Sequence, residues 1–211
     1  MAQFCDISGL GKLRVSGEAA NTFLQVMTTG DCDGPCLMLT SEAEVIDVVV
    51  VCATGPDEYM LTCDPANLDE VREWLVAHAA LKDQRGLIFP GVAIEDATER
   101  LASFAIFPHQ QADPVQVAAY AGIPCLMVQT ALLPGGVGEY HFMPKYKQQM
   151  AEVLEADGLK QLSLERYIER RRAAHTWFDQ AAEPRYYKVS ELPQLRRLLR
   201  NKHNFVGGKL V

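Results

Sequence analysis

The chain has 211 residues and a formal net charge of −7, and 48% of its residues are hydrophobic. This acidic balance disfavours nonspecific binding to nucleic acid or to an anionic membrane surface. The sequence shows no apolar run long enough to span a bilayer and no apolar leader at its start. We therefore expect a globular cytoplasmic protein, without membrane or nucleic-acid partners, whose six cysteines are reduced.

Strand and helix patterns alternate through the first half of the chain. Apolar residues at helical spacing predict helices over 18–30 and 65–80. The second helix has strong start signals, because Asp64 suits a cap and Pro65 suits the first helical position. The strands predicted in this half cover residues 11–17, 36–41, 44–52, 58–63 and 86–94.

The second half repeats this alternation. Helices are predicted over 113–122, opened by Asp113 and Pro114, and over 144–158. The strands predicted in this half cover residues 101–107, 124–130, 138–143 and 159–162, and two further helices cover 163–178 and 190–201. The pattern predicts an α+β fold of two tandem split-βαβ (ferredoxin-like) units followed by C-terminal helices. We expect one domain over 1–211, with parts at about 1–95 and 96–211.

A single carboxylate, Asp47, interrupts the apolar run from Val45 to Val51. Burying a lone charge in such a run is costly unless the charge is paired or hydrogen-bonded. Two interpretations stay open at this stage. Either the strand is amphipathic and Asp47 faces water, or Asp47 faces a pocket and takes part in proton transfer.

A second polar pair lies in the predicted strand over 138–143. Because side chains alternate along a strand, Glu139 and His141 share one face, while Tyr140 and Phe142 share the other. An acid beside an apolar slot suits a flat heterocycle that carries adjacent N–H donors. The alternative is an exposed polar face.

An arginine run and two cysteines contain the remaining candidate binding residues. Arg171 belongs to a run of three arginines, and its guanidinium suits a ligand carboxylate through a bidentate pair. The alternative is a solvated helix in which Glu169 pairs with arginines three residues away.

Cys32 and Cys36 have the spacing of two metal ligands, but no second cysteine or histidine pair accompanies them, so no metal site is expected.

The order of these pieces resembles the folate-binding region of the glycine cleavage T-protein (aminomethyltransferase) family. The matching stretches are CDISGLGKLRVSGEAANTFLQVMTTGD, AEVIDVVVVCATGPDEYMLTCDPANLDEVREWL and GEYHFM, and more weakly RYIERRRAAH and NFVGGKLV. The first two together cover residues 5–75 and carry most of the resemblance.

The family pattern departs from this sequence at its functional residues. Asp47 takes the place of the first of two family aspartates, and Val48 replaces the second, the one associated with folate chemistry. The family's pterin-binding glutamate falls at His141, with Glu139 two residues away on the same face. Arg171 survives from the family's Arg-Ile-Glu-Ala-Gly pattern, but Ala173 replaces the acid.

Other family features are absent. Pro35 falls where the family has a tyrosine, and the Lys-Gly-Cys-Tyr pattern of the iron–sulfur-cluster assembly relatives does not occur. The family's N-terminal segment and C-terminal β-barrel have no counterpart in the 211 residues.

The resemblance implies tetrahydrofolate-dependent transfer of an aminomethyl or methyl group. It implies Asp47 as the catalytic residue and Glu139, His141 and Arg171 as contacts to the folate. The departures keep an alternative open, a non-catalytic binding or assembly module that has lost the catalytic acid. A protein partner that supplies the missing barrel, or a homo-oligomer, also stays open.

Overall fold

A computed structural model describes residues 2–32, 34–109, 115–174 and 206. The chain forms two compact units. In the described residues, unit 1 contains 2–10 and 97–174, and unit 2 contains 11–96 and Val206. Each unit combines strands with helices, so the α+β class is confirmed. That residues 1–211 act as one domain stays a prediction.

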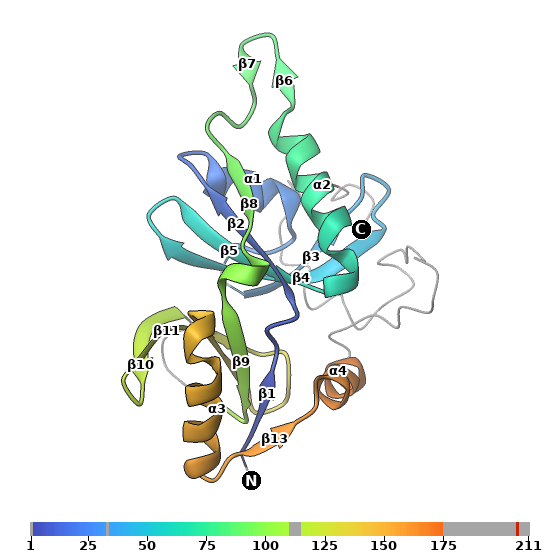
Figure 1. Ribbon diagram of the computed structural model, residues 1–211. Coiled ribbons are helices and arrows are strands. Elements are labelled where there is room, and N and C mark those ends of the chain that lie inside the picture. The colour runs from blue at the N-terminus through green and yellow to red at the C-terminus, as the bar shows by residue number, and fades with distance from the viewer. Residues whose placement is uncertain (1, 33, 110–114, 175–205, 207–211) are drawn as a thin grey trace. The chain divides into compact units, whose positions relative to one another are not determined.

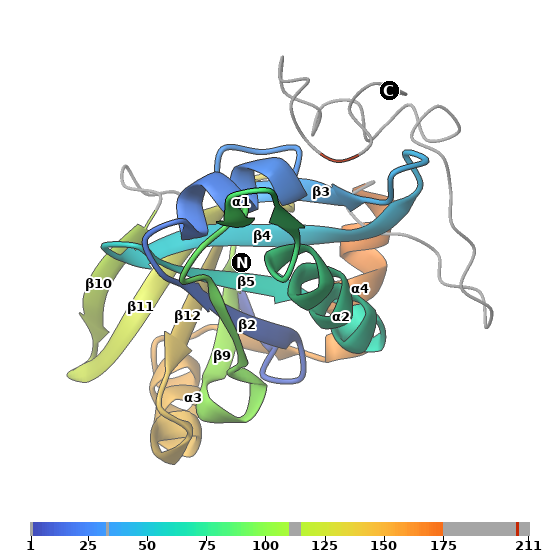
Figure 2. The same ribbon diagram turned by 90° about the horizontal axis from the view of Figure 1, so that it is seen from above.

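Unit 2 is built on a five-stranded antiparallel sheet in the order β3-β4-β5-β2-β8. Its strands are β2 (Gly11–Ser16), β3 (Gly34–Leu39), β4 (Val45–Gly55), β5 (Glu58–Cys63) and β8 (Ala93–Asp96). Figure 2 shows the long strand β4 running between β3 and β5. The first four strands overlap the strands predicted over 11–17, 36–41, 44–52 and 58–63.

Two helices cover one face of this sheet. Helix α1 (Ala20–Met27) and helix α2 (Leu68–Ala79) contribute their apolar stripes to a single core with the strands. Asp64 is a cap as predicted, but it caps the short 3-10 turn η1 (Pro65–Asn67) that leads into α2. Its carboxylate accepts a hydrogen bond from the Ala66 backbone N–H at 2.8 Å.

The strand predicted over 86–94 is wrong as one element. Residues 82–87 form a small hairpin of β6 (Lys82–Asp83) and β7 (Gly86–Leu87), and β8 begins only at Ala93. Between them lies Gly91, whose φ of 76° breaks the extended conformation.

Unit 1 is built on a six-stranded mixed sheet in the order β10-β11-β12-β9-β1-β13. Its strands are β1 (Gln3–Asp6), β9 (Ala102–Phe107), β10 (Val115–Tyr120), β11 (Ile123–Thr130), β12 (Val137–Phe142) and β13 (Lys160–Leu162). Strand β1, which was not predicted, lies between β9 and β13 (Figure 1). It pairs antiparallel with β9 and parallel with β13.

Helices α3 (Lys147–Ala156) and α4 (Leu164–Ala173) lie on opposite sides of this sheet (Figure 1). Met150 and Leu154 of α3 pack in a core that includes Phe104 of β9. Tyr167 of α4 packs on Phe107, with the ring centroids 5.6 Å apart. Since Phe104 and Phe107 differ by an odd number of positions, they project from opposite faces. Short 3-10 turns, η2 (Thr98–Arg100) and η3 (Pro144–Tyr146), precede β9 and α3.

The helix predicted over 113–122 is wrong, and with it the split-βαβ order in this half. Residues 115–120 form β10, which pairs along its whole length with β11. Ala121 and Gly122, both with positive φ, make the two-residue turn between them.

The helix predicted from 163 is confirmed as far as Ala173, and the rest of it and the helix over 190–201 lie outside the described residues. No helix in the described part of the chain is both long and apolar enough to cross a membrane.

Candidate functional site

Asp47 is buried in unit 2, with 1% of its surface exposed, so the water-facing interpretation is wrong. Its Oδ1 accepts the backbone N–H of Val48 at 2.7 Å, and its Oδ2 accepts the backbone N–H of Asp64 at 2.7 Å. Hydrogen bonds to an ionised acceptor are the strong ones. The carboxylate therefore fastens β4 to the start of the η1–α2 segment.

A β-bulge directly before Asp47 sets the direction of its side chain. Met38 pairs with Asp47 but Leu39 pairs with Val45, which leaves Ile46 as the extra residue of β4. From Asp47 onward the pairing is regular, so Asp47 shares a face with Val49, which packs in the core beneath the helices.

Glu139 and His141 are buried in unit 1, with exposures of 1% and 2%, so an exposed polar face is excluded here. Both project from β12 on the face opposite Tyr140 and Phe142, which pack in the α3 core as the alternation predicted. The Nε2 atom of His141 lies 3.7 Å from Oε2 of Glu139. Its Nδ1 lies 2.8 Å from the Oγ atom of Ser103 on β9.

Arg171 is also buried in unit 1, with 3% exposure, so it does not lie on a solvated helix face. Its guanidinium carbon lies 5.9 Å from the centroid of the Tyr167 ring. Burial raises the pKa of Tyr167; the Arg171 charge opposes this rise and the Glu139 charge adds to it. Arg171 and Glu139 are thus both close enough to Tyr167 to affect its pKa.

Three of the four predicted site residues therefore come together, and Asp47 lies in the other unit. We call Ser103, Glu139, His141, Tyr167 and Arg171 the buried polar cluster of unit 1. Sequence reasoning missed two of these residues. Tyr167 precedes Arg171 by four positions and so shares its helix face, and Ser103 interrupts an apolar strand much as Asp47 does. Those two signals were present in the sequence.

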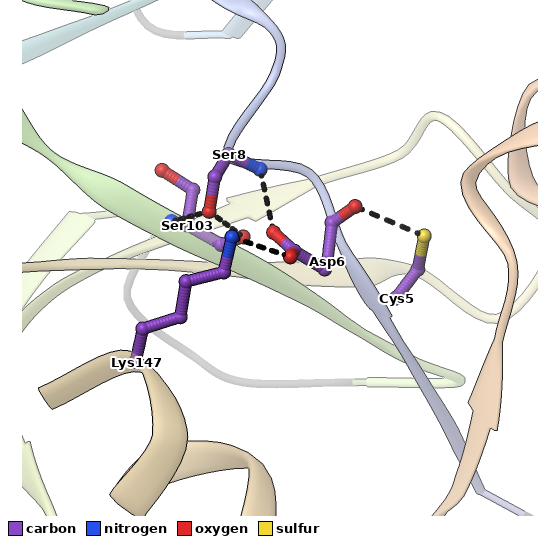
Figure 3. A network of polar contacts seen from close by, with 5 residues as sticks. All are labelled: Cys5, Asp6, Ser8, Ser103 and Lys147. Carbon is purple, nitrogen blue, oxygen red and sulfur yellow. Dashed lines mark hydrogen bonds and ion pairs between the residues drawn. The ribbon is translucent and has the colours of Figure 1, made fainter. Parts of the chain in front are cut away.

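A second polar network adjoins this cluster (Figure 3). The Oδ2 atom of Asp6 lies 2.7 Å from Nζ of Lys147, and its Oδ1 accepts the backbone N–H of Ser8 at 2.9 Å. The Oγ atom of Ser8 accepts the backbone N–H of Ser103 at 3.0 Å. Burial raises the pKa of Asp6, but the hydrogen bonds from Lys147 and Ser8 outweigh it and hold that pKa below its ordinary value.

A pocket of about 400 Å³ lies elsewhere in unit 1. Its walls include Gln3, Phe107, Pro108, Leu133, Pro134 and Arg170. The Arg170 guanidinium donates to Oε1 of Gln3 at 2.7 Å and lies over the Phe107 ring. None of the four predicted site residues lines this pocket.

The cysteines show no sign of a metal centre in the described residues. Cys32 and Cys36 are both buried, and no group of three or more metal-ligating side chains occurs in the part of the chain that the structure describes.

Known structures and sequences show which fold and which family this chain has. The fold is similar to that of glycine cleavage system aminomethyltransferase T from Bartonella henselae, whose crystal structure matches with a TM-score of 0.65 and 13% identity, over 99% of this chain and 61% of that one. A model of the GCVT N-terminal domain matches residues 1–110, half of the chain. The chain therefore belongs to the GCVT N-terminal domain family.

Curated relatives with similar sequences are described as aminomethyltransferases. The aminomethyltransferase of Chlorobium chlorochromatii is 34% identical over 108 residues, which cover 48% of this chain and 28% of that protein. The aminomethyltransferase of Geobacillus kaustophilus is 28% identical over 167 residues, which cover 71% of this chain and 44% of that protein. The chain thus spans less than half the length of these relatives.

Proposed function

We propose that this chain is a folate-binding, T-protein-like protein that acts in tetrahydrofolate-dependent transfer of an aminomethyl or methyl group. One observation carries the proposal. Glu139, His141 and Arg171 are buried together within unit 1 of a chain that belongs to the GCVT N-terminal domain family. We place the protein in the cytoplasm as part of the same proposal.

The chemistry of the cluster fits a reduced folate. A pterin ring presents adjacent N–H donors, which an ionised Glu139 accepts, and His141 lies beside that carboxylate. Arg171 suits the carboxylates of the glutamate tail. Bound tetrahydrofolate supplies the nitrogen that receives the one-carbon group. Asp47 is the acid that we propose for proton transfer.

Calorimetry tests the binding. Tetrahydrofolate or folinic acid is titrated into the protein at about 100 µM, a concentration suited to weak complexes. We expect measurable heat with the wild-type protein and about tenfold weaker binding with Glu139→Gln, because the amide accepts less strongly than a carboxylate. Glu152→Gln, on the exposed face of α3, is the matched control and is expected to bind as the wild type does. Absence of heat with both folates would remove the proposal.

A specific observation favours a second function, a non-catalytic binding or assembly module. Both oxygens of Asp47 already accept backbone N–H groups, and Val48 stands at the place of the family's second aspartate. Asp47→Asn separates the two functions in an assay of one-carbon transfer. Turnover in the wild type that is lost in the folded variant supports catalysis by Asp47, whereas folate binding without turnover in either protein supports the module. Purification from the native cell with a second chain attached would show that the module works inside a larger enzyme.

A further inference from the structure

Ser103 contacts His141 through its side chain. The two residues are direct cross-strand partners in the pairing of β9 with β12, on the face of the sheet opposite α3. Side chains in such positions stand close together. Ser103 is fully buried, and its Oγ lies 2.8 Å from Nδ1 of His141.

The backbone of Ser103 is fixed independently of His141. Its N–H donates to Oγ of Ser8, and its carbonyl accepts the backbone N–H of Ile7 at 2.9 Å. Ser8 in turn donates its own N–H to Asp6, which Lys147 neutralises. Figure 3 shows these side chains drawn together from β1, β9 and α3. The hydroxyl of Ser103 thus projects from an anchored strand position.

We infer that Ser103 is a positioning residue, whose hydroxyl donates to Nδ1 of His141 and so fixes the neutral imidazole with its proton on Nε2. In that tautomer the proton is on the nitrogen of His141 that lies 3.7 Å from Oε2 of Glu139. Which nitrogen carries the proton is set by the partner of the other nitrogen. The inference rests on the proposed function, because the oriented Glu139–His141 pair is what the folate is proposed to meet.

Nitrogen-15 NMR of labelled protein reads the tautomer of His141 directly, at a pH where the imidazole is neutral and with no folate present. We expect the Nε2–H form in the wild type and a change in the tautomer ratio with Ser103→Ala. Ser103→Thr keeps a hydroxyl and suits a strand, so it is expected to restore the wild-type signal. Thr130→Val removes another buried hydroxyl of the same sheet and is expected to change nothing at His141. Thermal unfolding confirms that each variant is folded.

The second measurement is the affinity for folinic acid. We expect Ser103→Ala to bind about tenfold more weakly, the effect of losing one hydrogen bond in a buried polar network, and Ser103→Thr to bind as the wild type does. An unchanged tautomer in Ser103→Ala overturns the inference. So does a wild-type affinity in that variant. If the wild-type protein itself binds no folate, the proposed function fails, and this outcome is distinct from the other two.

Discussion

Asp47 joins two segments of unit 2 by accepting backbone N–H groups from both. Its carboxylate is bound like that of a helix-capping aspartate and unlike that of a solvent-accessible catalytic acid, because each oxygen accepts a backbone N–H at 2.7 Å. A carboxylate in this position contributes to stability whether or not it takes part in catalysis. Stability and activity of Asp47 variants therefore need separate measurements.

Asp47→Asn is expected to lower the free energy of unfolding by about 2 kcal/mol, because the amide nitrogen is a donor and faces a backbone N–H. Urea denaturation measures this change. Asp57→Asn is the control, since Asp57 is exposed and its φ of 52° suits asparagine. Equal midpoints for Asp47→Asn and the wild type would contradict the anchoring role.

The cysteines of the native protein are expected to react slowly with thiol reagents. All six are buried. Burial, with a smaller contribution from Asp6, raises the pKa of Cys5 to about 12, and burial with the charge of Asp47 raises that of Cys63 as well. Both remain thiols at pH 8, and the thiolate is the reactive form.

Ellman's reagent at pH 8 tests this expectation. All six thiols should react in guanidinium chloride, and far fewer should react in the native protein over the same time. Rapid reaction of all six without denaturant would show that the thiols are accessible.

At the scale of elements, the N-terminus of α3 is held to β1 by an ion pair. Lys147 begins the helix, where a cation is disfavoured by the helix dipole, and Asp6 offsets this charge. The pKa of Asp6 is lowered in the folded state. The pair therefore stabilises the protein above the ordinary aspartate pKa of about 3.9, and this contribution is lost as the pH falls through the folded-state value.

Lys147→Met is expected to cost about 0.5 kcal/mol at pH 7, a small cost because water screens a pair in which the lysine is nearly half exposed. The cost is expected to be smaller at pH 3, which lies below the ordinary pKa of an aspartate. Urea denaturation at the two pH values measures the difference. Lys160→Met, an exposed lysine of the same unit, is the control. A loss of equal size at both pH values would mean that packing, and not charge, holds α3 in place.

Elements with strong local patterns could be predicted from the sequence, and elements that depend on distant partners could not. Helix α2 and strand β4 follow from periodicity and capping. Strand β1 has only four residues and owes its conformation to β9 and β13, which come much later in the chain. Strand β10 follows an Asp-Pro pair typical of helix starts, yet its pairing with β11 overrides that local preference.

The same distinction applies to the candidate site. Alternation places Glu139 and His141 on one face of a strand, as expected. Their burial was not predictable, because it depends on what covers that face. The contacts of Asp47 with Asp64 and of His141 with Ser103 likewise join segments that only the folded chain brings together.

On the scale of the whole chain, unit 1 is assembled from both ends of the described sequence. Strand β1 occupies an interior position in its sheet. A fragment of residues 97–174 therefore lacks the strand that joins β9 to β13. We expect this fragment to show no cooperative thermal transition by circular dichroism.

Addition of a synthetic peptide of residues 1–10 is expected to restore ordered structure to the fragment, and a scrambled peptide of equal composition is the control. A cooperative transition in the fragment alone would show that the sheet tolerates the loss of β1.

The place of β1 also has a consequence for biosynthesis. The ribosome synthesises this strand before either of its neighbours, and β13 follows more than 150 residues downstream. Residues 11–96 emerge as one continuous stretch and can collapse while translation continues. Strand β1 must meanwhile stay without its sheet neighbours, and such an unpaired strand favours aggregation and chaperone capture until β9 and β13 have left the exit tunnel.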